Sequence, residues 1–175
     1  VEDTSVSTPS GDIPIQNLNV GDLVNTFVNS YDELTTSTIE ALISHTAEED
    51  SFGLYELKTD NKEVTATGNH PFIKLLDDGS PLWTMIAHLN VGDKVYTEDG
   101  ETETIISIKN LDKKEDTYNV EVSDTHTYIA DGFRVHNLMG RGPRSNIGAG
   151  RIDKSQKKQL PPQTRRRGGR LGRRR

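Results

Sequence analysis

Short runs of alternating apolar and polar residues occupy most of the chain up to Asn137. The runs Glu63–Thr67, Glu103–Ile108 and Thr117–Val122 alternate with a period of two and are rich in β-branched residues, which is typical of strands. Turn-forming residues separate such runs at intervals of about 8–12 residues, the spacing of all-β domains. We therefore predict an all-β fold. Further strands are predicted at Leu23–Ser30, Ser37–His45, Phe52–Thr59 and Pro71–Leu76, and a short helix near Trp83–Leu89.

One phrase of the sequence occurs twice. Leu-Asn-Val-Gly-Asp-Leu-Val at Leu18–Val24 returns almost letter for letter as Leu-Asn-Val-Gly-Asp-Lys-Val at Leu89–Val95. The interval is too long for a solenoid repeat, so the recurrence favours two similar halves of one β domain, related by a pseudo-two-fold axis. The alternative is a common turn phrase that recurs by chance.

The alternating pattern ends at Asn137, and the composition changes there. Residues 138–175 hold 13 Lys and Arg and a single acid, Asp153, whereas residues 1–137 hold 8 basic and 26 acidic residues. The net charges are thus +12 and −18. Because the Gly-, Pro- and Arg-rich tail cannot bury enough apolar surface to offset chain entropy, we predict a domain at 1–137 and a disordered basic tail at 138–175.

Several classes of site and segment are excluded by composition. The chain has no cysteine, which rules out disulfides, thiolate metal sites and a cysteine nucleophile within it. No apolar run is long enough to span a membrane. Val1–Ser10 lacks the basic and apolar regions of a signal peptide, and since the chain does not start with Met we expect it to be a fragment of a longer protein.

The strongest local signal is the dipeptide Asp131-Gly132 between two apolar runs. Such a dipeptide favours a two-residue β-hairpin loop with positive φ at both positions. The resulting register places His126 opposite Asn137 and Thr127 opposite His136, and residues opposite one another have Cβ atoms about 4.5–5.5 Å apart. An asparagine side-chain nitrogen can attack its own backbone carbonyl, close a succinimide and cut the chain, given orientation and proton transfer. The hairpin therefore predicts a site at His126, His136 and Asn137.

A second candidate group follows the predicted strand Glu63–Thr67. In the sequence Thr67-Gly-Asn-His70-Pro-Phe, a turn at Gly68 lets Thr67 and His70 converge on one peptide group. The Thr67 hydroxyl and the Asn69 amide can polarise its carbonyl, while His70 can shuttle its proton.

Taken together, these motifs resemble the Hint domains, the self-processing modules of inteins, bacterial intein-like elements and hedgehog C-terminal domains. The resemblance covers about residues 1–137 and includes the Thr-x-x-His-Pro-Phe motif, both Val-Gly-Asp phrases, Tyr118–Val122 and the His126–Asn137 segment. It implies a compact all-β Hint horseshoe with pseudo-two-fold symmetry. The interval from Phe72 to Tyr118 is too short for an inserted homing endonuclease, so we expect a mini form. The resemblance also implies roles: Thr67 and His70 assist the acyl shift at an upstream junction, His126 aids later steps, and His136 with Asn137 performs cleavage between Asn137 and Leu138.

Three features depart from the family pattern. The chain begins at Val1-Glu-Asp-Thr4, where the family has a leading Cys or Ser, so we expect the N-terminal nucleophile to be missing from this chain. Leu138 has no side-chain atom that could receive an acyl group, which points to an intein-like element that favours cleavage over ligation. Asn119 stands where many inteins carry an acid, and an amide cannot act as a general base.

The expected activity is therefore single-turnover, autocatalytic cleavage, with the flanking segments as substrate, no cofactor and a monomeric state. An alternative is a β scaffold that presents the polybasic tail to nucleic acid or an acidic partner; the tail has no aromatic residue, so such binding would be nonspecific and salt-dependent. A third is a zinc site formed by His70, His126 and His136, for which the motifs supply no carboxylate partner.

Overall fold

The computed structural model describes residues 1–137; the tail predicted to be disordered, 138–175, lies outside the described residues. The described part contains fourteen strands and two three-residue 3₁₀ helices, so the all-β prediction is confirmed. No helix in this part is long and apolar enough to cross a membrane. The 3₁₀ helices are η1 (Ile15–Asn17) and η2 (Ile86–His88).

The strands form three antiparallel sheets. The largest has the order β10-β9-β7-β14-β13-β1-β2, with β8 also paired to β7, and it comprises β1 (Ser5–Val6), β2 (Ile13–Pro14), β7 (Pro71–Leu75), β8 (Pro81–Met85), β9 (Lys94–Tyr96), β10 (Thr102–Thr104), β13 (Thr127–Ala130) and β14 (Phe133–His136). The second has the order β11-β5-β6: β11 (Ser107–Leu111), β5 (Leu54–Lys58) and β6 (Glu63–Thr67). The third has the order β12-β4-β3: β12 (Thr117–Val122), β4 (Thr35–His45) and β3 (Leu23–Thr26).

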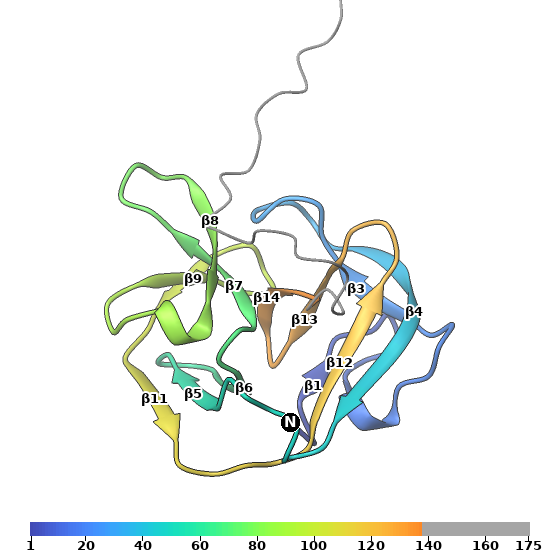
Figure 1. The fold of residues 1–175 in the computed structure, drawn as a ribbon. Coiled ribbons are helices and arrows are strands. Elements are labelled where there is room, and N and C mark those ends of the chain that lie inside the picture. The colour runs from blue at the N-terminus through green and yellow to red at the C-terminus, as the bar shows by residue number, and fades with distance from the viewer. Residues whose placement is uncertain (138–175) are drawn as a thin grey trace, which may run out of the picture.

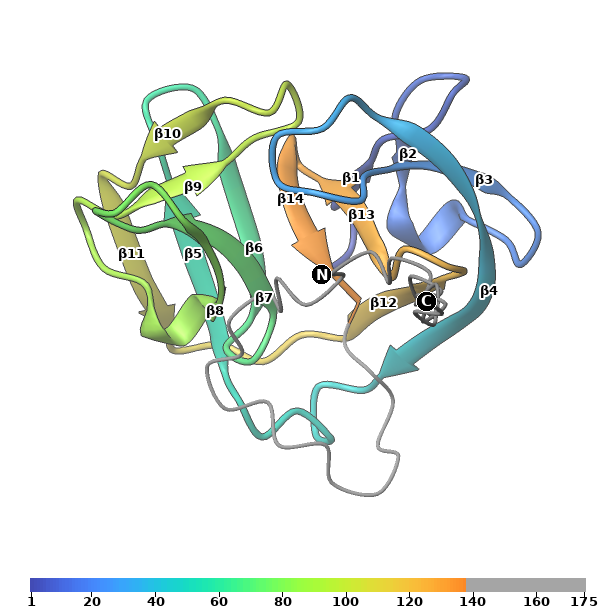
Figure 2. The ribbon, with the colours of Figure 1, turned by 90° about the horizontal axis from the view of Figure 1, so that it is seen from above.

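These sheets divide the molecule into two groups of strands. Strands β5–β11 lie on one side and β1–β4 with β12 on the other, while the β13–β14 hairpin lies between them (Figures 1 and 2). A continuous apolar core runs through both groups, and it includes Val24, Phe72, Val95, Val120 and Phe133. The hairpin is thus the element that both groups share.

The two copies of the repeated phrase fold alike. A 3₁₀ helix precedes each copy, and Gly21 and Gly92 both have a φ of 94°. The amide of Gly21 donates to Ile39 O and that of Gly92 to Ile105 O, each at 2.9 Å. Identical local geometry at two equivalent positions supports internal duplication rather than a phrase that recurs by chance.

Two details differ from the sequence-based expectation. The predicted helix near Trp83–Leu89 is only the turn η2, because Pro81–Met85 pairs with β7 as a strand, with Trp83 opposite Ile73. The predicted strand Glu103–Ile108 is divided, because the amide of Ile105 donates to Asp93 O while that of Ile106 donates to Lys58 O in another sheet.

Candidate active site

The hairpin β13–β14 has the predicted turn and register. Asp131 and Gly132 have φ values of 49° and 77°, and Thr127 lies opposite His136. Beyond the last strand pair, the amide of Asn137 donates to His126 O at 2.9 Å, so this pairing also follows the expected register. Gly132 is needed here because a side chain rarely adopts its backbone conformation.

His126 itself is turned away from a regular strand conformation. Its φ is 55°, in the left-handed region that non-glycine residues seldom occupy. The imidazole stacks near that of His136, with ring centroids 6.3 Å apart and an interplanar angle of 27°. The register brings the two residues near Asn137.

Asn137 is enclosed although it is the last residue of the described part. Its relative exposure is 3%, and its side-chain Oδ1 has no hydrogen-bond partner among residues 1–137. Nδ1 of His136 lies 2.7 Å from the backbone carbonyl oxygen of Asn137. Since a carbonyl oxygen can only accept, the proton of this hydrogen bond resides on Nδ1.

The surroundings of His136 favour its neutral form. Burial lowers the pKa of His136, the hydrogen bond to Asn137 opposes this shift, and the neighbouring charge of His126 adds to it. With Nδ1 protonated, the neutral ring leaves Nε2 free of a proton. The ring also contacts Trp83 of β8, edge to face, with centroids 5.2 Å apart.

The segment Thr67–His70 forms a tight turn between β6 and β7. The amide of His70 donates to Thr67 O at 2.8 Å, and the amide of Gly68 donates to Gly53 O at 2.9 Å. A Cβ on Gly68 would lie 2.6 Å from Phe52 O, so glycine is required there by close backbone approach. Asn69 Oδ1 is buried in this turn without a hydrogen-bond partner in the described residues.

The imidazole of His70 is held in the interior. Its pKa is lowered to about 3, mainly by burial and in part by the charges of the N-terminal amino group and of His136. Nε2 lies 3.4 Å from the hydroxyl oxygen of Tyr128, whose own pKa is raised by burial. The His70 imidazole and the Tyr128 hydroxyl are therefore both uncharged at physiological pH.

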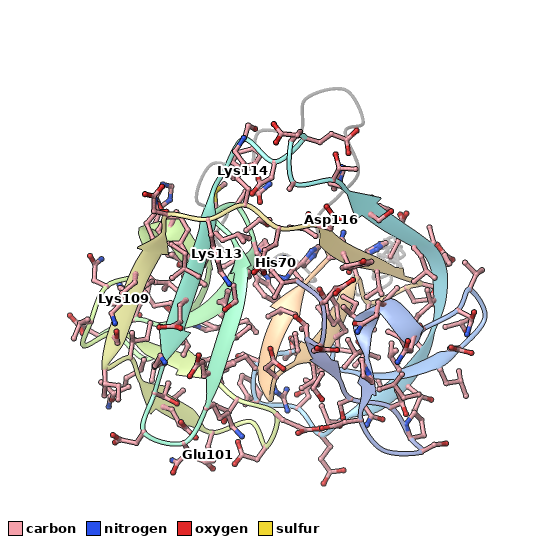
Figure 3. All side chains as sticks on the ribbon, turned by 90° about the horizontal axis from the view of Figure 1, so that it is seen from below. His70, Glu101, Lys109, Lys113, Lys114 and Asp116 are labelled. Carbon is pink, nitrogen blue, oxygen red and sulfur yellow. The ribbon has the colours of Figure 1, made fainter. Side chains whose placement is uncertain are left out.

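A cavity of 620 Å³ joins this turn to the start of the chain. His70 lies near the middle of the molecule, between the two groups of strands (Figure 3). Burial lowers the pKa of the Val1 amino group, which shares the cavity with the buried Asn119. The cavity is lined by Thr67, Asn69 and His70 and by Tyr128 and Val135 of the hairpin.

The six predicted residues thus form two groups. His126, His136 and Asn137 meet at its open end, and Thr67, Asn69 and His70 meet at the cavity. The pairing of Val135 with Phe72 connects the two groups. Within residues 1–137 no three His, Asp or Glu side chains are placed to hold a metal ion, so the three histidines do not form the zinc site considered from the sequence.

Three residues that contact or support these groups were not predicted from the sequence. Trp83 was placed in a helix, and nothing in its neighbourhood signals a contact with His136. Tyr128 stands out only as a polar-tipped aromatic in a buried strand. Arg134 is an isolated charge between Phe133 and Val135, which is a signal of an internal hydrogen-bonded site, and it is only 1% exposed.

Comparison with known proteins places this arrangement in a family. The family model for the pretoxin HINT domain matches residues 5–139. An uncharacterized protein of Methanocaldococcus jannaschii is 32% identical over 94 residues; the match covers 50% of this chain and 13% of that protein. The chain thus spans a small part of this much longer relative.

Solved structures with the same fold are inteins and an intein-like domain. The bacterial intein-like domain from Clostridium thermocellum has a TM-score of 0.65 at 26% identity, covering 78% of this chain and 96% of that one. The DnaB intein from Synechocystis sp. PCC 6803 has a TM-score of 0.67 at 20% identity, covering 79% and 96%. Because the family model covers most of the sequence and the fold agrees, the chain belongs to the pretoxin HINT domain family, within the Hint and intein superfamily.

Proposed function

We propose that this domain cleaves its own chain between Asn137 and Leu138 by cyclisation of the Asn137 side chain. Autoprocessing is the general activity that the Hint fold supports, and the flanking segments of the chain are then the substrate. The observation that carries the specific reaction is the 2.7 Å approach of His136 Nδ1 to the carbonyl oxygen of a buried Asn137. This carbonyl belongs to the bond that would be cut.

The reaction is balanced within the chain. Nδ2 of Asn137 attacks the Asn137 carbonyl carbon, and the bond from that carbon to the Leu138 nitrogen breaks. One proton leaves Nδ2 and one arrives on the Leu138 nitrogen, so residues 1–137 end in a succinimide and Leu138 becomes a new amino terminus. Ring closure within one residue needs orientation rather than binding, and the buried position of Asn137 restricts its side chain.

His136 is suited to two parts of this reaction. Its Nδ1–H donates to the oxygen that becomes negatively charged in the tetrahedral intermediate, as an oxyanion-hole donor does. Its unprotonated Nε2 can accept a proton. The adjacent ring of His126 is the second imidazole within reach of the site, and we assign it to proton transfer to the leaving nitrogen.

The cavity at His70 suits an earlier step at an upstream junction. In a longer chain, the peptide bonds preceding Val1 would enter the cavity that Thr67, Asn69 and His70 line. The buried Asn69 Oδ1 without a partner in residues 1–137 fits a site that awaits a polar group of the substrate. We propose that these three residues polarise such a bond.

The test uses the 175-residue chain incubated at neutral pH and followed by intact mass. We expect two fragments, and the fragment 1–137 should be lighter by one water than a hydrolysis product. Asn137→Gln, which would have to close a six-membered ring, should stay intact. The dipeptide Asn-Leu also occurs at Asn110-Leu111, and absence of cleavage there provides an internal control.

A result in which the wild type persists as long as Asn137→Gln would exclude cyclisation at this position. Cleavage at Asn110-Leu111 at a similar rate would show that the reaction is not a property of the folded site. Cleavage at Asn137-Leu138 without the loss of water would indicate direct hydrolysis instead.

A second candidate function follows from the charge of the tail. Residues 138–175 carry a net +12 beside a domain of net −18, and a segment of this charge can bind polyanions. We propose this as an additional property of the full chain, tested below.

A further inference from the structure

Trp83 lies against the candidate catalytic imidazole although the two residues are far apart in the sequence. Its ring centroid is 5.2 Å from that of His136, with an interplanar angle of 82°. On another side the same imidazole meets His126, with the rings 27° from parallel. His136 is therefore held between two aromatic neighbours, one from β8 and one from the residue that precedes β13.

Trp83 is in turn supported from behind. Its ring stacks on Phe27, with centroids 6.4 Å apart and an interplanar angle of 28°. The guanidinium of Arg134 lies over the Phe27 ring, 4.8 Å from its centroid. Phe27 and Arg134 are each 1% exposed, so neither can move away without opening the core. The contacts form a column, Arg134–Phe27–Trp83–His136, that ends at the scissile carbonyl.

We propose that Trp83 is a positioning residue for His136, which keeps the imidazole turned so that Nδ1 faces the Asn137 carbonyl oxygen. The expected effect of Trp83 on the rate of cleavage rests on the cyclisation proposed above. The expected orientation of the His136 ring rests only on the contacts among Arg134, Phe27, Trp83 and His136.

The physical reason lies in the geometry of the contact. A perpendicular pair of rings places the positive edge of one against the negative face of the other, and this favours one arrangement over a free rotation. The hydrogen bond of His136 to Asn137 is local, between adjacent residues, and the Trp83 contact adds a second restraint on the ring from another strand. Displacement of a reacting group by about 1 Å can cost about 100-fold in rate.

The first experiment reads the contact directly. Trp83 is the single tryptophan of the chain, so its emission reports on this site alone. Protonation of an adjacent imidazole quenches indole fluorescence, and we expect the emission of the uncleavable Asn137→Gln protein to fall as His136 is protonated. Adding His136→Gln should abolish this change, while adding His126→Gln should leave it in place; His126 and His70 are the other titratable groups that face His136.

The second experiment separates positioning from packing. Trp83→Ala removes the ring, Trp83→Phe keeps an aromatic edge, and Leu82→Ala removes an apolar side chain from the opposite face of β8 as the matched control. We expect cleavage to slow about 10-fold or more in Trp83→Ala and to be largely retained in Trp83→Phe and Leu82→Ala. In the uncleavable background, imidazole nitrogen shifts should show His136 protonated on Nδ1 in the parent, Trp83→Phe and Leu82→Ala proteins, and this tautomer should be lost in Trp83→Ala.

The outcomes distinguish this proposal from the proposed function. If Trp83→Ala leaves the Nδ1-protonated tautomer of His136 in place, positioning by Trp83 is wrong, whether or not the chain cleaves. If this tautomer is lost in Trp83→Ala while the wild type does not cleave, the ring orientation stands and the cyclisation fails. If Trp83→Ala does not fold, the fluorescence experiment decides. A pH-dependent fall in Trp83 emission that persists in His136→Gln would show that the two rings are not in contact.

Discussion

The Tyr128 hydroxyl oxygen lies 3.4 Å from Nε2 of His70, and both side chains are buried. Burial lowers the pKa of His70 and raises that of Tyr128, so the contact joins two neutral groups. A phenol that donates to Nε2 fixes the imidazole proton on Nδ1. The contact therefore determines which nitrogen of His70 can donate into the cavity.

Tyr128→Phe should shift His70 toward the tautomer protonated on Nε2, because the ring remains while the donor is lost. We also expect a loss of about 1 kcal/mol in the free energy of unfolding, the usual contribution of one hydrogen bond. Nitrogen chemical shifts of the imidazole measure the tautomer. Tyr118→Phe is the matched control, since Tyr118 also lines the cavity but its hydroxyl donates to Glu2 at the surface. An unchanged His70 tautomer in Tyr128→Phe would contradict the assignment.

The stability of the domain should depend on pH through His70. Its pKa is about 3 in the folded protein and about 6.5 in an unfolded chain, so the unfolded state binds a proton that the folded state does not between these values. The stabilisation is present above pH 6.5 and is lost as the pH falls toward 3, by up to about 1.4 kcal/mol per pH unit. Urea unfolding at several pH values measures this slope.

The contribution of His70 to this pH dependence is the difference between the slopes of the wild type and of His70→Asn, because the carboxylates titrate in both proteins. We expect the wild type to lose stability more steeply on acidification. His88→Asn, at an exposed histidine, is the control and should follow the wild-type profile. Parallel profiles for the wild type and His70→Asn would show that His70 is not desolvated in the folded protein.

The hairpin and the repeated phrase were predictable because each is encoded locally. Asp131-Gly132 specifies a turn with two positive φ values, and the turn sets the register that brings His136 and Asn137 near His126. The stretch Leu18–Val24 and its copy carry the same turn chemistry and fold alike. The strand at Glu63–Thr67 has the predicted bounds because its alternation is uninterrupted.

What the sequence did not reveal depends on contacts between distant segments. The strand at Trp83 exists because β7 offers it a partner, and local propensity does not encode that partner. Likewise, the 11-residue strand β4 pairs with both β3 and β12, and the split after Thr104 follows from a change of partner between Ile105 and Ile106. The positive φ of His126 is also not signalled by its sequence neighbourhood.

Binding of the basic segment 138–175 to polyanions should depend on salt concentration. Full-length Asn137→Gln protein should be retained on an anionic polymer at low ionic strength, and retention should fall steeply with added salt because binding releases counterions. Residues 1–137 alone, with their net charge of −18, should not be retained. Elution of the full chain in the flow-through at low salt would show that the acidic domain outweighs or masks the tail.

Arg134 should be essential for the fold because its side chain joins two loops, one that contains Asn29 and Asp32 and one that contains Thr97 and Glu98. Its guanidinium donates to four backbone carbonyl oxygens, at distances of 2.7–3.0 Å, those of Thr97, Asn29, Asp32 and Glu98. Burial lowers the pKa of Arg134 and the charges of Asp32, Asp99 and Glu98 oppose this shift, so the group remains charged.

Arg134→Lys keeps the charge but cannot reach all four acceptors from one ammonium, so we expect a loss of about 2–4 kcal/mol in the free energy of unfolding. Arg134→Met should lose as much or more, since it leaves the carbonyls without a donor. Lys62→Met removes a cation from the same surface pocket and is the control, with little change expected. If Arg134→Lys unfolds at the same urea concentration as the wild type, a positive charge alone is enough to stabilise the fold. The hydrogen bonds from Arg134 to the two loops would then not be what holds these loops in place.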